Sequence, residues 1–481
     1  MDINDGHDFL IIGDNVVYCN PIVKKALSDE ILSESEFLDE EDVAHALEKA
    51  RFFKQHGLKH SLDNSKMFTR MKPIEIERNI ANLPQITFEV TDSCNLKCKY
   101  CSFGEFYDEH DTRTNQMLDE KKAFLLLDYL IDKWNSPLNT SHGRDVYVSF
   151  YGGEPLLNMD FIKQIVAFMK RSTLLYNKVR FSMTTNGLLI KKYLPFLIEN
   201  DFRILISIDG NSEGHSYRVD HSGKNSFDRV FKNIQYIQKT YPEFFEANVN
   251  FNAVLHNRNS VESIYQFIKT EFGKIPSIAE VNNTGIRRDK WDDYFKTYRN
   301  TRESLYQAED YSIIQQNMFL KLGEVRDIGL FLFKHSGNMF QVYNDLFVDL
   351  DNFKRFPTGT CEPFGKKMFL SVNGRILPCE RVEHKYDLGV VDETGVLIDC
   401  KKIADAYNQH FDKLSNQCNN CYNAEVCEQC IFHLKNLNNN PVCQGHINQA
   451  GFQYGVNYRM HYLAEHKGVY SKLINELIFQ D

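Results

Sequence analysis

The segment TDSCNLKCKYC, residues 91–101, directly follows a strand-like run, ITFEV at residues 86–90. It contains three cysteines, Cys94, Cys98 and Cys101, in the spacing C-x3-C-x2-C. Three thiolates can bind three irons of a [4Fe-4S] cluster and leave the fourth iron open to a substrate or cofactor. The segment therefore predicts a loop that holds an iron-sulfur cluster with one reactive iron.

The composition is that of a large globular protein. With 481 residues and 42% hydrophobic content, the chain can bury a large core, and its length suggests two to three domains. Its longest apolar runs, at residues 123–127 and 330–333, are far below the ~20 residues of a membrane span. The first residues lack the pattern of a signal peptide. We therefore expect a cytoplasmic protein with no membrane partner.

Charge and cysteine usage narrow the function classes. A net charge of -9 argues against nucleic acid as a partner, because such binders need a clustered basic surface. In a reducing compartment the 12 cysteines are expected to be ligands or buried fillers, not disulfides. Only Cys19 and Cys400 lie outside a pattern, and we interpret both as small buried apolar residues.

From about residue 84 to 290 the sequence alternates between strand and helix patterns. Strands are expected at 86–90, 145–151, 179–184, 202–208, 248–254 and, more weakly, 277–282, and helices near 119–134, 159–170, 190–199, 226–240 and 260–271. Repeated units of this kind predict a parallel sheet of about six strands, curved by right-handed crossovers. Ligands in such folds bind at the carboxyl ends of the strands.

Chemically informative residues follow those strand ends. The second strand is followed by GGEP at residues 152–155, in which two glycines allow close backbone approach and Glu154 can accept a hydrogen bond from an ammonium group. The third strand ends TTNG at 184–187, and the fourth ends SIDG at 207–210, with Arg218 shortly after. Short polar side chains can bind the hydroxyls of a ribose, and the guanidinium of an arginine can bind a carboxylate with two hydrogen bonds. The alternative for Arg218 is an ordinary surface salt bridge.

These motifs resemble, in their order, those of the radical S-adenosylmethionine (SAM) enzymes. In that family the aromatic residue before the last cysteine, here Tyr100, packs near adenine, and the segment matching GGEP binds the SAM amino group. The resemblance implies a SAM site made by Tyr100, Gly152, Gly153, Glu154, Thr185, Ser207, Asp209, Arg218, Asn252 and Val254. No residue stands out as a catalytic base, so we assign none.

A second group of cysteines lies toward the C-terminus. Cys361 and Cys379 form C-x12-G-x4-C, with a hairpin turn expected at residues 373–374. The rest follow as C-x2-C-x5-C-x2-C and one later cysteine, at Cys418, Cys421, Cys427, Cys430 and Cys443. Structural zinc is the rival explanation, but paired knuckles that share one zinc normally have ~15–20 residues between them. Five residues between the pairs fit two metal centres better.

This order of cysteines resembles the SPASM domain, which carries two auxiliary [4Fe-4S] clusters in radical SAM enzymes that modify peptides and proteins. The resemblance implies that Cys361, Cys379 and Cys430 serve the first auxiliary cluster. It assigns Cys418, Cys421, Cys427 and Cys443 to the second. The spacing before Cys430 departs from the family by one residue. The first cluster then has three obvious ligands, so it has an open iron or takes Cys400 or His433 as a fourth.

The predicted fold class is α/β: a partial (β/α)6, TIM-like radical SAM barrel with a C-terminal iron-sulfur (SPASM) domain and a small N-terminal α+β unit. We expect the N-terminal unit at 1–80, with a hairpin of 9–12 and 15–18 and helices at 21–27 and 41–53. The barrel is expected at 84–290, a helical linker at 291–355, the SPASM domain at 356–450 and a C-terminal helical segment at 451–481. The N-terminal unit loosely resembles leader-docking modules; a capping extension is the alternative.

The resemblance implies three [4Fe-4S] clusters, SAM, and an external one-electron reductant of the flavodoxin or ferredoxin type. SAM would be cleaved to a 5′-deoxyadenosyl radical that abstracts hydrogen from an unactivated C–H bond. The leading hypothesis is a maturase that oxidatively modifies, by cross-linking, a ribosomally made precursor peptide with a leader. One alternative is a sulfatase-type maturase that forms formylglycine. The other is a non-catalytic iron-sulfur protein that binds peptide or transfers electrons.

Overall fold

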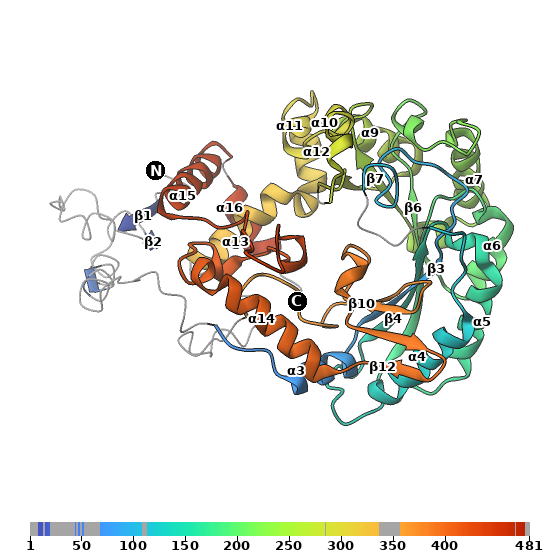
Figure 1. Ribbon diagram of the computed structural model, residues 1–481. Coiled ribbons are helices and arrows are strands. Elements are labelled where there is room, and N and C mark those ends of the chain that lie inside the picture. The colour runs from blue at the N-terminus through green and yellow to red at the C-terminus, as the bar shows by residue number, and fades with distance from the viewer. Residues whose placement is uncertain are drawn as a thin grey trace. The chain divides into compact units, whose positions relative to one another are not determined.

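The computed structural model describes residues 8–12, 15–19, 44, 47–48, 51, 68–107, 113–283, 285–335, 356–466 and 468–476. The chain forms two compact units (Figure 1). The barrel unit consists of Met71–Met318 and Cys361–Tyr407, and the second unit consists of Met1–Arg70, Phe319–Thr360 and Asn408–Asp481. None of the helices in the described ranges is long and apolar enough to cross a membrane.

The barrel unit is built on one sheet with the strand order β12-β11-β10-β9-β3-β4-β5-β6-β7-β8. Its strands are β3 (Gln85–Thr91), β4 (Asp145–Gly152), β5 (Lys178–Thr185), β6 (Arg203–Ser207), β7 (Val249–Leu255), β8 (Ser277–Glu280), β9 (Met368–Leu370), β10 (Arg375–Leu377), β11 (Gly389–Asp392) and β12 (Gly395–Leu397). The six strands from β3 to β8 pair in parallel, which confirms the expected parallel sheet.

The sheet is longer than the sequence predicts, because β9 pairs in parallel with β3 and three antiparallel strands follow it. The expected turn at residues 373–374 is present between β9 and β10, and Gly374 has a φ of 83°. This positive φ is the reason a glycine suits the position. Residues from the C-terminal part of the sequence thus complete the wall beside the first barrel strand.

The helices of the barrel unit precede, separate and follow the parallel strands. They are α3 (Pro73–Ala81), α4 (Glu120–Trp134), α5 (Met159–Arg171), α6 (Ile190–Glu199), α7 (Phe227–Thr240), α8 (Pro242–Asn248), α9 (Val261–Phe272), α10 (Trp291–Thr297), α11 (Thr301–Tyr306) and α12 (Tyr311–Met318). The start of α4 is fixed by Asp119, whose carboxylate accepts a hydrogen bond from the Lys121 N–H at 2.9 Å. Figure 1 shows α5, α6 and α7 along the outer side of the sheet.

The two faces of the sheet differ in polarity, because side chains alternate along each strand. On β3, Ile86 and Phe88 are fully buried, and Phe88 packs on Phe161 of α5 with ring centroids 5.9 Å apart. Gln85 and Thr87 have the opposite parity and face the inside of the curved sheet. The apolar outer face forms the core under the helices, and the polar inner face remains available for ligands.

The second unit contains the hairpin of β1 (Asp8–Ile12) and β2 (Asn15–Cys19), which confirms the expected N-terminal hairpin. The helices expected at 21–27 and, apart from a few positions, at 41–53 lie outside the described residues. The expected linker is helical in α10 to α12 and in α13 (Gly323–His335), and its part at 336–355 is also outside the described residues.

The remaining helices are α14 (Cys400–Asn419), α15 (Gln449–Glu465) and α16 (Val469–Glu476). The last two confirm the helical character expected for the C-terminal segment. Short 3-10 helices are η3 (Pro155–Asn158), η4 (Gly214–Tyr217), η5 (Arg288–Lys290), η6 (Phe319–Lys321), η9 (His384–Tyr386), η10 (Ala424–Val426) and η11 (Ile431–His433).

Candidate active site

The loop with the first three cysteines begins where β3 ends and packs directly on the turn after β4. The N–H of Gly153 donates to the carbonyl of Thr91 at 2.8 Å, and that of Glu154 donates to the carbonyl of Ser93 at 2.9 Å. A Cβ on Gly153 would lie 1.9 Å from the Ser93 oxygen. Gly152, with a φ of 116°, has a conformation that L side chains rarely adopt. The glycine pair is therefore needed for the two segments to meet.

The three cysteines of this loop are partly buried. Burial raises the pKa of Cys94 to about 11 and that of Cys98 to about 12. Thiols with such pKa values become thiolates only where a nearby positive charge compensates the loss of water. The irons of a cluster would supply that charge, so the residues fit the expected group.

Glu154 lies at the centre of the expected SAM site and is 1% exposed. Its Oε1 accepts a hydrogen bond from the Thr185 hydroxyl at 2.6 Å, and its Oε2 accepts one from the Asn186 N–H at 2.8 Å. Burial raises the pKa of Glu154 to about 7, although these hydrogen bonds oppose the rise. The carboxylate joins the ends of β4 and β5 and is suited to receive an amino group.

Other residues of the predicted SAM site lie at the ends of β6 and β7. Ser207 and Asn252 are directly opposite each other in the sheet, and the Ser207 hydroxyl donates to the Asn252 amide oxygen at 3.0 Å. Asp209 accepts a hydrogen bond from the N–H of Val254 at 3.0 Å. The structure thus brings these four residues together at one edge of the sheet.

Arg218 is buried and its guanidinium forms a two-bond ion pair with Asp209, with Nε at 2.9 Å and Nη2 at 3.1 Å. The hydroxyl of Tyr100 also donates to Asp209. The surface salt bridge considered as an alternative for Arg218 is therefore replaced by a buried ion pair. Whether Arg218 also contacts a carboxylate of SAM stays a prediction.

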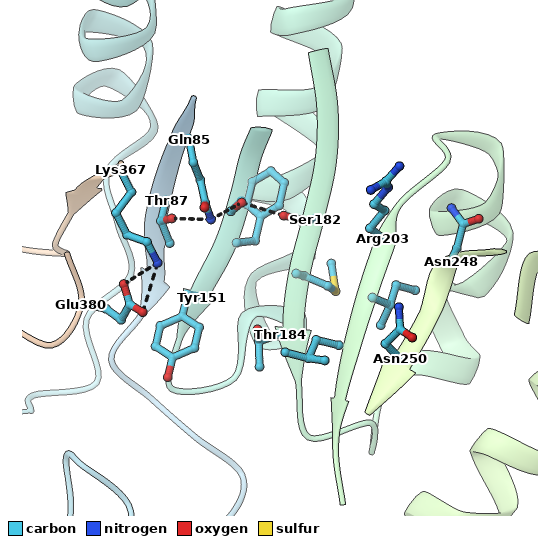
Figure 2. A pocket seen from close by; sticks show the side chains of 15 residues that line it. Gln85, Thr87, Tyr151, Ser182, Thr184, Arg203, Asn248, Asn250, Lys367 and Glu380 are labelled. Carbon is cyan, nitrogen blue, oxygen red and sulfur yellow. Dashed lines mark hydrogen bonds and ion pairs between the residues drawn. The ribbon is translucent and has the colours of Figure 1, made fainter. Parts of the chain in front are cut away.

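A cavity of about 280 Å³ lies on the polar inner face of the sheet (Figure 2). Fifteen residues line it, among them Gln85, Ser149, Tyr151, Ser182 and Thr184. A chain of hydrogen bonds crosses its floor, from Gln85 to Ser149 at 2.9 Å and between the hydroxyls of Ser149 and Ser182 at 2.6 Å. The cavity is thus lined by amides and hydroxyls that can bind a polar molecule.

The cavity reaches the expected cofactor edge, because Tyr151 directly precedes Gly152 and Thr184 directly precedes Thr185. At its wall, Lys367 and Glu380 form an ion pair with Nζ and Oε2 3.1 Å apart. Figure 2 shows this pair close to Tyr151. Burial, followed by the charge of Glu380, raises the pKa of Tyr151 to about 12.

Sequence reasoning missed Lys367, Glu380 and Tyr151. Glu380 directly follows Cys379, and Tyr151 directly precedes the two glycines, so adjacency to a predicted ligand is the signal that points to both. It also missed Arg113, whose Nε and Nη2 are buried without a hydrogen-bond partner. Its guanidinium lies over the ring of Phe103, 4.0 Å from the centroid.

The predicted ligands of the second auxiliary cluster lie together in the second unit. Cys418, Cys421, Cys427 and Cys443 line one small cavity, and burial raises the pKa of Cys418 to about 12. Gly359 packs so closely on this site that a Cβ there would lie 1.8 Å from the Cys427 oxygen. Four such thiols around one cavity fit a bound cluster.

The cysteines predicted for the first auxiliary cluster are divided between the units. Cys361 and Cys379 belong to the barrel unit, and Cys430 belongs to the second unit. Of the two candidates for a fourth ligand, Cys400 is in the barrel unit and His433 is in the second unit. Within the described ranges, no three His, Cys, Asp or Glu side chains converge closely enough to hold a single metal ion. The ligands of this cluster stay a prediction.

Residues 88–270 match the model of the Radical SAM superfamily. The chain is 26% identical over 211 residues to the cysteine-type anaerobic sulfatase-maturating enzyme of Clostridium novyi, a match that covers 42% of this chain and 53% of that protein. The chain therefore spans about half the length of this curated relative.

Two other relatives extend the comparison. The radical SAM cyclopropyl synthase TigE of Paramaledivibacter caminithermalis is 21% identical over 440 residues, which are 88% of this chain and 84% of that protein. The mycofactocin maturase MftC of Mycolicibacterium smegmatis is 26% identical over 234 residues, which are 48% of this chain and 52% of that protein.

Among solved structures, native anSMEcpe with bound AdoMet superposes with a TM-score of 0.51 at 18% identity. The match covers 81% of this chain and 98% of that one. The same protein with bound AdoMet and the Kp18Cys peptide gives a TM-score of 0.52. At this identity the likeness shows the fold, and it agrees with the expected barrel carrying a C-terminal cysteine-rich region.

Proposed function

We propose, from the radical SAM domain at residues 88–270, that this protein is an enzyme that oxidatively modifies, by cross-linking, residues of a ribosomally made precursor peptide. The family implies a [4Fe-4S] cluster and SAM. Cys94, Cys98 and Cys101 would hold the cluster, and the residues around Glu154 and Asp209 would hold SAM. When bound, the two together supply a 5′-deoxyadenosyl radical that removes a hydrogen atom from a C–H bond.

The observation that carries the proposal is the polar cavity beneath the expected cofactor edge. A volume of about 280 Å³ can hold one or two side chains of a peptide. Its lining of amides and hydroxyls can orient a polar chain and keep bulk water from the reacting carbon. Tyr151 and Thr184 form the part of the lining nearest the cofactor edge.

Forming a new bond or double bond in the substrate requires more than hydrogen abstraction. One hydrogen atom leaves to the SAM-derived radical, and the second hydrogen must leave as a proton while one electron goes to an acceptor. Among the described residues lining the cavity, Glu380 is the one carboxylate, so we assign it as the proton acceptor. Lys367, whose Nζ lies 3.1 Å from Oε2, holds the carboxylate in place.

The electron acceptors that we propose are two auxiliary [4Fe-4S] clusters. Cys418, Cys421, Cys427 and Cys443, which line one cavity, would hold one of them. Cys361, Cys379 and Cys430 would hold the other. An external flavodoxin-type or ferredoxin-type reductant would supply the electron for SAM cleavage and recover the electron released by the substrate.

We also propose that the N-terminal unit, residues 1–80, docks the leader of the precursor. The β1–β2 hairpin is an element to which an extended peptide can add as a strand. Deleting residues 1–67 is expected to weaken binding of the precursor about 10-fold or more, measured by titration with labelled peptide. Unchanged affinity would refute the docking role and favour a capping extension.

A second candidate, formylglycine formation, is favoured by the match to the sulfatase-maturating enzyme of C. novyi. Mass spectrometry of the product separates the two. A cross-link removes hydrogen alone and joins two residues, whereas conversion of Cys to formylglycine removes sulfur and adds oxygen at one residue. Peptides encoded beside the gene and fragments of sulfatases are the substrates to compare.

The decisive experiment begins with anaerobic reconstitution with iron and sulfide, followed by SAM and a reductant. The wild type is expected to form 5′-deoxyadenosine. A Cys94/Cys98/Cys101→Ala variant is expected to form none while it keeps the iron of the C-terminal sites. If the wild type forms none and contains zinc, the non-catalytic peptide-binding alternative takes the place of this proposal.

A further inference from the structure

A single buried carboxylate joins three segments of the expected cofactor site. Asp209 is 0% exposed and follows β6 by two residues. One of its oxygens, Oδ1, accepts the N–H of Val254 on β7 at 3.0 Å, and the other accepts the hydroxyl of Tyr100 from the cysteine loop. The carboxylate thus ties the cysteine loop to the sheet.

The same carboxylate orients Arg218. Its Nε donates to Oδ2 at 2.9 Å and its Nη2 donates to Oδ1 at 3.1 Å. This planar two-bond pairing fixes the plane of the guanidinium and leaves Nη1 as the nitrogen that Asp209 does not engage. The guanidinium carbon also lies 5.4 Å from the centre of the Tyr100 ring, so both partners of Asp209 are held against each other.

The ring of Tyr100 is packed on two further sides. It stacks on His256, with centroids 5.4 Å apart and planes at 27°, and meets Tyr217 edge-on at 6.5 Å. The backbone carbonyl of Asp209 accepts a hydrogen bond from Asn259 at 3.1 Å. The position of the Tyr100 ring therefore depends on the hydrogen bond from its hydroxyl to Asp209 and on its packing against His256 and Tyr217.

The charges in this cluster are balanced by the ion pair. Burial alone would raise the pKa of Asp209, but the Arg218 charge, the His256 ring, whose Nε2 lies 3.8 Å from Oδ2, and the hydrogen bonds from Arg218 bring it below its ordinary value. The hydrogen bonds that the two Asp209 oxygens accept all come from protein groups, namely Arg218, Tyr100 and the N–H of Val254. A carboxylate so engaged is poorly placed to bind the ribose or the amino group of a ligand directly.

We propose that Asp209 is a positioning residue of the cofactor site: it does not touch SAM but holds the Tyr100 ring against adenine and turns Nη1 of Arg218 toward the methionine carboxylate. This rests on the proposed function, since both contacts presuppose SAM in the site. It refines the sequence prediction, in which Asp209 itself was a SAM ligand. Tyr100 and Arg218 act as one unit because they share one acceptor.

The first test removes a hydroxyl and compares two neighbouring tyrosines. Tyr100→Phe loses the bond to Asp209, whereas Tyr217→Phe loses a bond to Asn257 at 2.9 Å in the same packed cluster. We measure equilibrium binding of SAM and of 5′-methylthioadenosine, which lacks the amino-acid part, to reconstituted protein. Tyr100→Phe is expected to weaken binding of both ligands about 10-fold, and Tyr217→Phe to change neither.

The second test changes the acceptor itself. Asp209→Asn keeps the shape but removes the charge that orients Arg218, so SAM is expected to lose clearly more affinity than 5′-methylthioadenosine. Asp209→Ala removes both oxygens, so the double variant Tyr100→Phe/Asp209→Ala should bind 5′-methylthioadenosine no more weakly than Asp209→Ala alone, because either change removes the same hydrogen bond. Iron content and the EPR spectrum of the reduced cluster without SAM should match the wild type in Tyr100→Phe.

The outcomes separate this inference from the proposed function. Wild-type protein that binds no SAM refutes both. Wild-type binding with equal losses in Tyr100→Phe and Tyr217→Phe, or with additive losses in the double variant, refutes the positioning role alone. If Asp209→Asn does not fold, the two tyrosine variants still test the positioning role, because of these two tyrosines Tyr100 is the one whose hydroxyl bonds to Asp209.

Discussion

At the scale of single residues, the chemistry of the site depends on where charge is buried. Glu154 is buried in the turn after β4, and desolvation, opposed by three hydrogen bonds, raises its pKa to about 7. Below that pH the side chain is neutral and cannot attract an amino group. In protein without SAM, ionising this buried acid costs folding free energy, so stability is expected to fall as the pH rises through about 7.

Binding of SAM should therefore depend on pH with the opposite sign. Ionised Glu154 is the form that would accept hydrogen bonds from the amino group of SAM in the proposed site, so affinity is expected to rise about 10-fold per pH unit below pH ~7 and level off above it. Equilibrium binding from pH ~6 to ~8 measures this. In Glu154→Gln the profile should be flat, with weaker binding throughout. A wild-type profile without slope would contradict the role of Glu154.

Glu380 offers a prediction about the substrate half of the reaction. Glu380→Gln keeps the size of the side chain and removes its ability to take a proton. Formation of modified product is expected to fall about 100-fold, while 5′-deoxyadenosine continues to form, because hydrogen abstraction precedes loss of the proton. The two products are measured by mass spectrometry in one reaction. Equal loss of both would show that Glu380 acts on cofactor binding instead.

At the scale of elements, the barrel strands were predictable because their pattern is local. The expected strand at 86–90 and the helix at 190–199 correspond to β3 (Gln85–Thr91) and α6 (Ile190–Glu199). Buried parallel strands have a continuous apolar face, and their helices have clear start and stop signals. Periodicity alone could therefore place the strand ends at which Glu154 and Ser207 lie.

The pairing of β9 with β3 and the Lys367–Glu380 wall could not be predicted in the same way. Residues Met368–Leu370 are too short to give a periodic signal, and their partner lies some 280 positions earlier in the chain, as the pairing Ile86–Met368 shows. The bond from Tyr100 to Asp209 is equally non-local. Tertiary contacts of this kind leave no mark on the sequence around either partner.

Two tight contacts between elements lead to a paired prediction. Gly153→Ala would place a methyl group 1.9 Å from the Ser93 oxygen, and Gly359→Ala would place one 1.8 Å from the Cys427 oxygen. Neither backbone oxygen can move without displacing a cysteine loop, so each change is expected to cost about 2 kcal/mol or more. Thermal unfolding and iron analysis measure the effect.

The two variants should differ in which cluster they lose. Gly153→Ala should lose the EPR signal that responds to SAM, and Gly359→Ala should lose iron while that signal remains. Gly451→Ala in α15 is the control: it lies in a helix, its nearest neighbour would be the Cγ2 methyl group of Ile447 at 3.3 Å, and alanine favours helices. A loss of SAM response in Gly359→Ala would mean that the two sites are not independent.

At the scale of the whole molecule, two compact units divide the expected redox chemistry. The barrel unit contains Cys94 and the polar cavity, and the second unit contains the four cysteines around their own cavity. Because the proposed net reaction releases one electron from the substrate, a protein that lacks the second site should start the reaction without completing it. This is expected of a Cys418/Cys421/Cys427/Cys443→Ser variant.

In that variant, 5′-deoxyadenosine formation is expected to remain within about 3-fold of the wild type, while oxidised product falls below detection. The substrate radical should instead be quenched by an electron from the external reductant and a proton from solvent, so a reaction run in deuterium oxide should leave deuterium at the abstracted position of the peptide. Iron per chain and the spectrum of the SAM-responsive cluster show whether the barrel unit is intact. Normal product yield without the four cysteines would show that the electron leaves by another route, and the second site would then be structural.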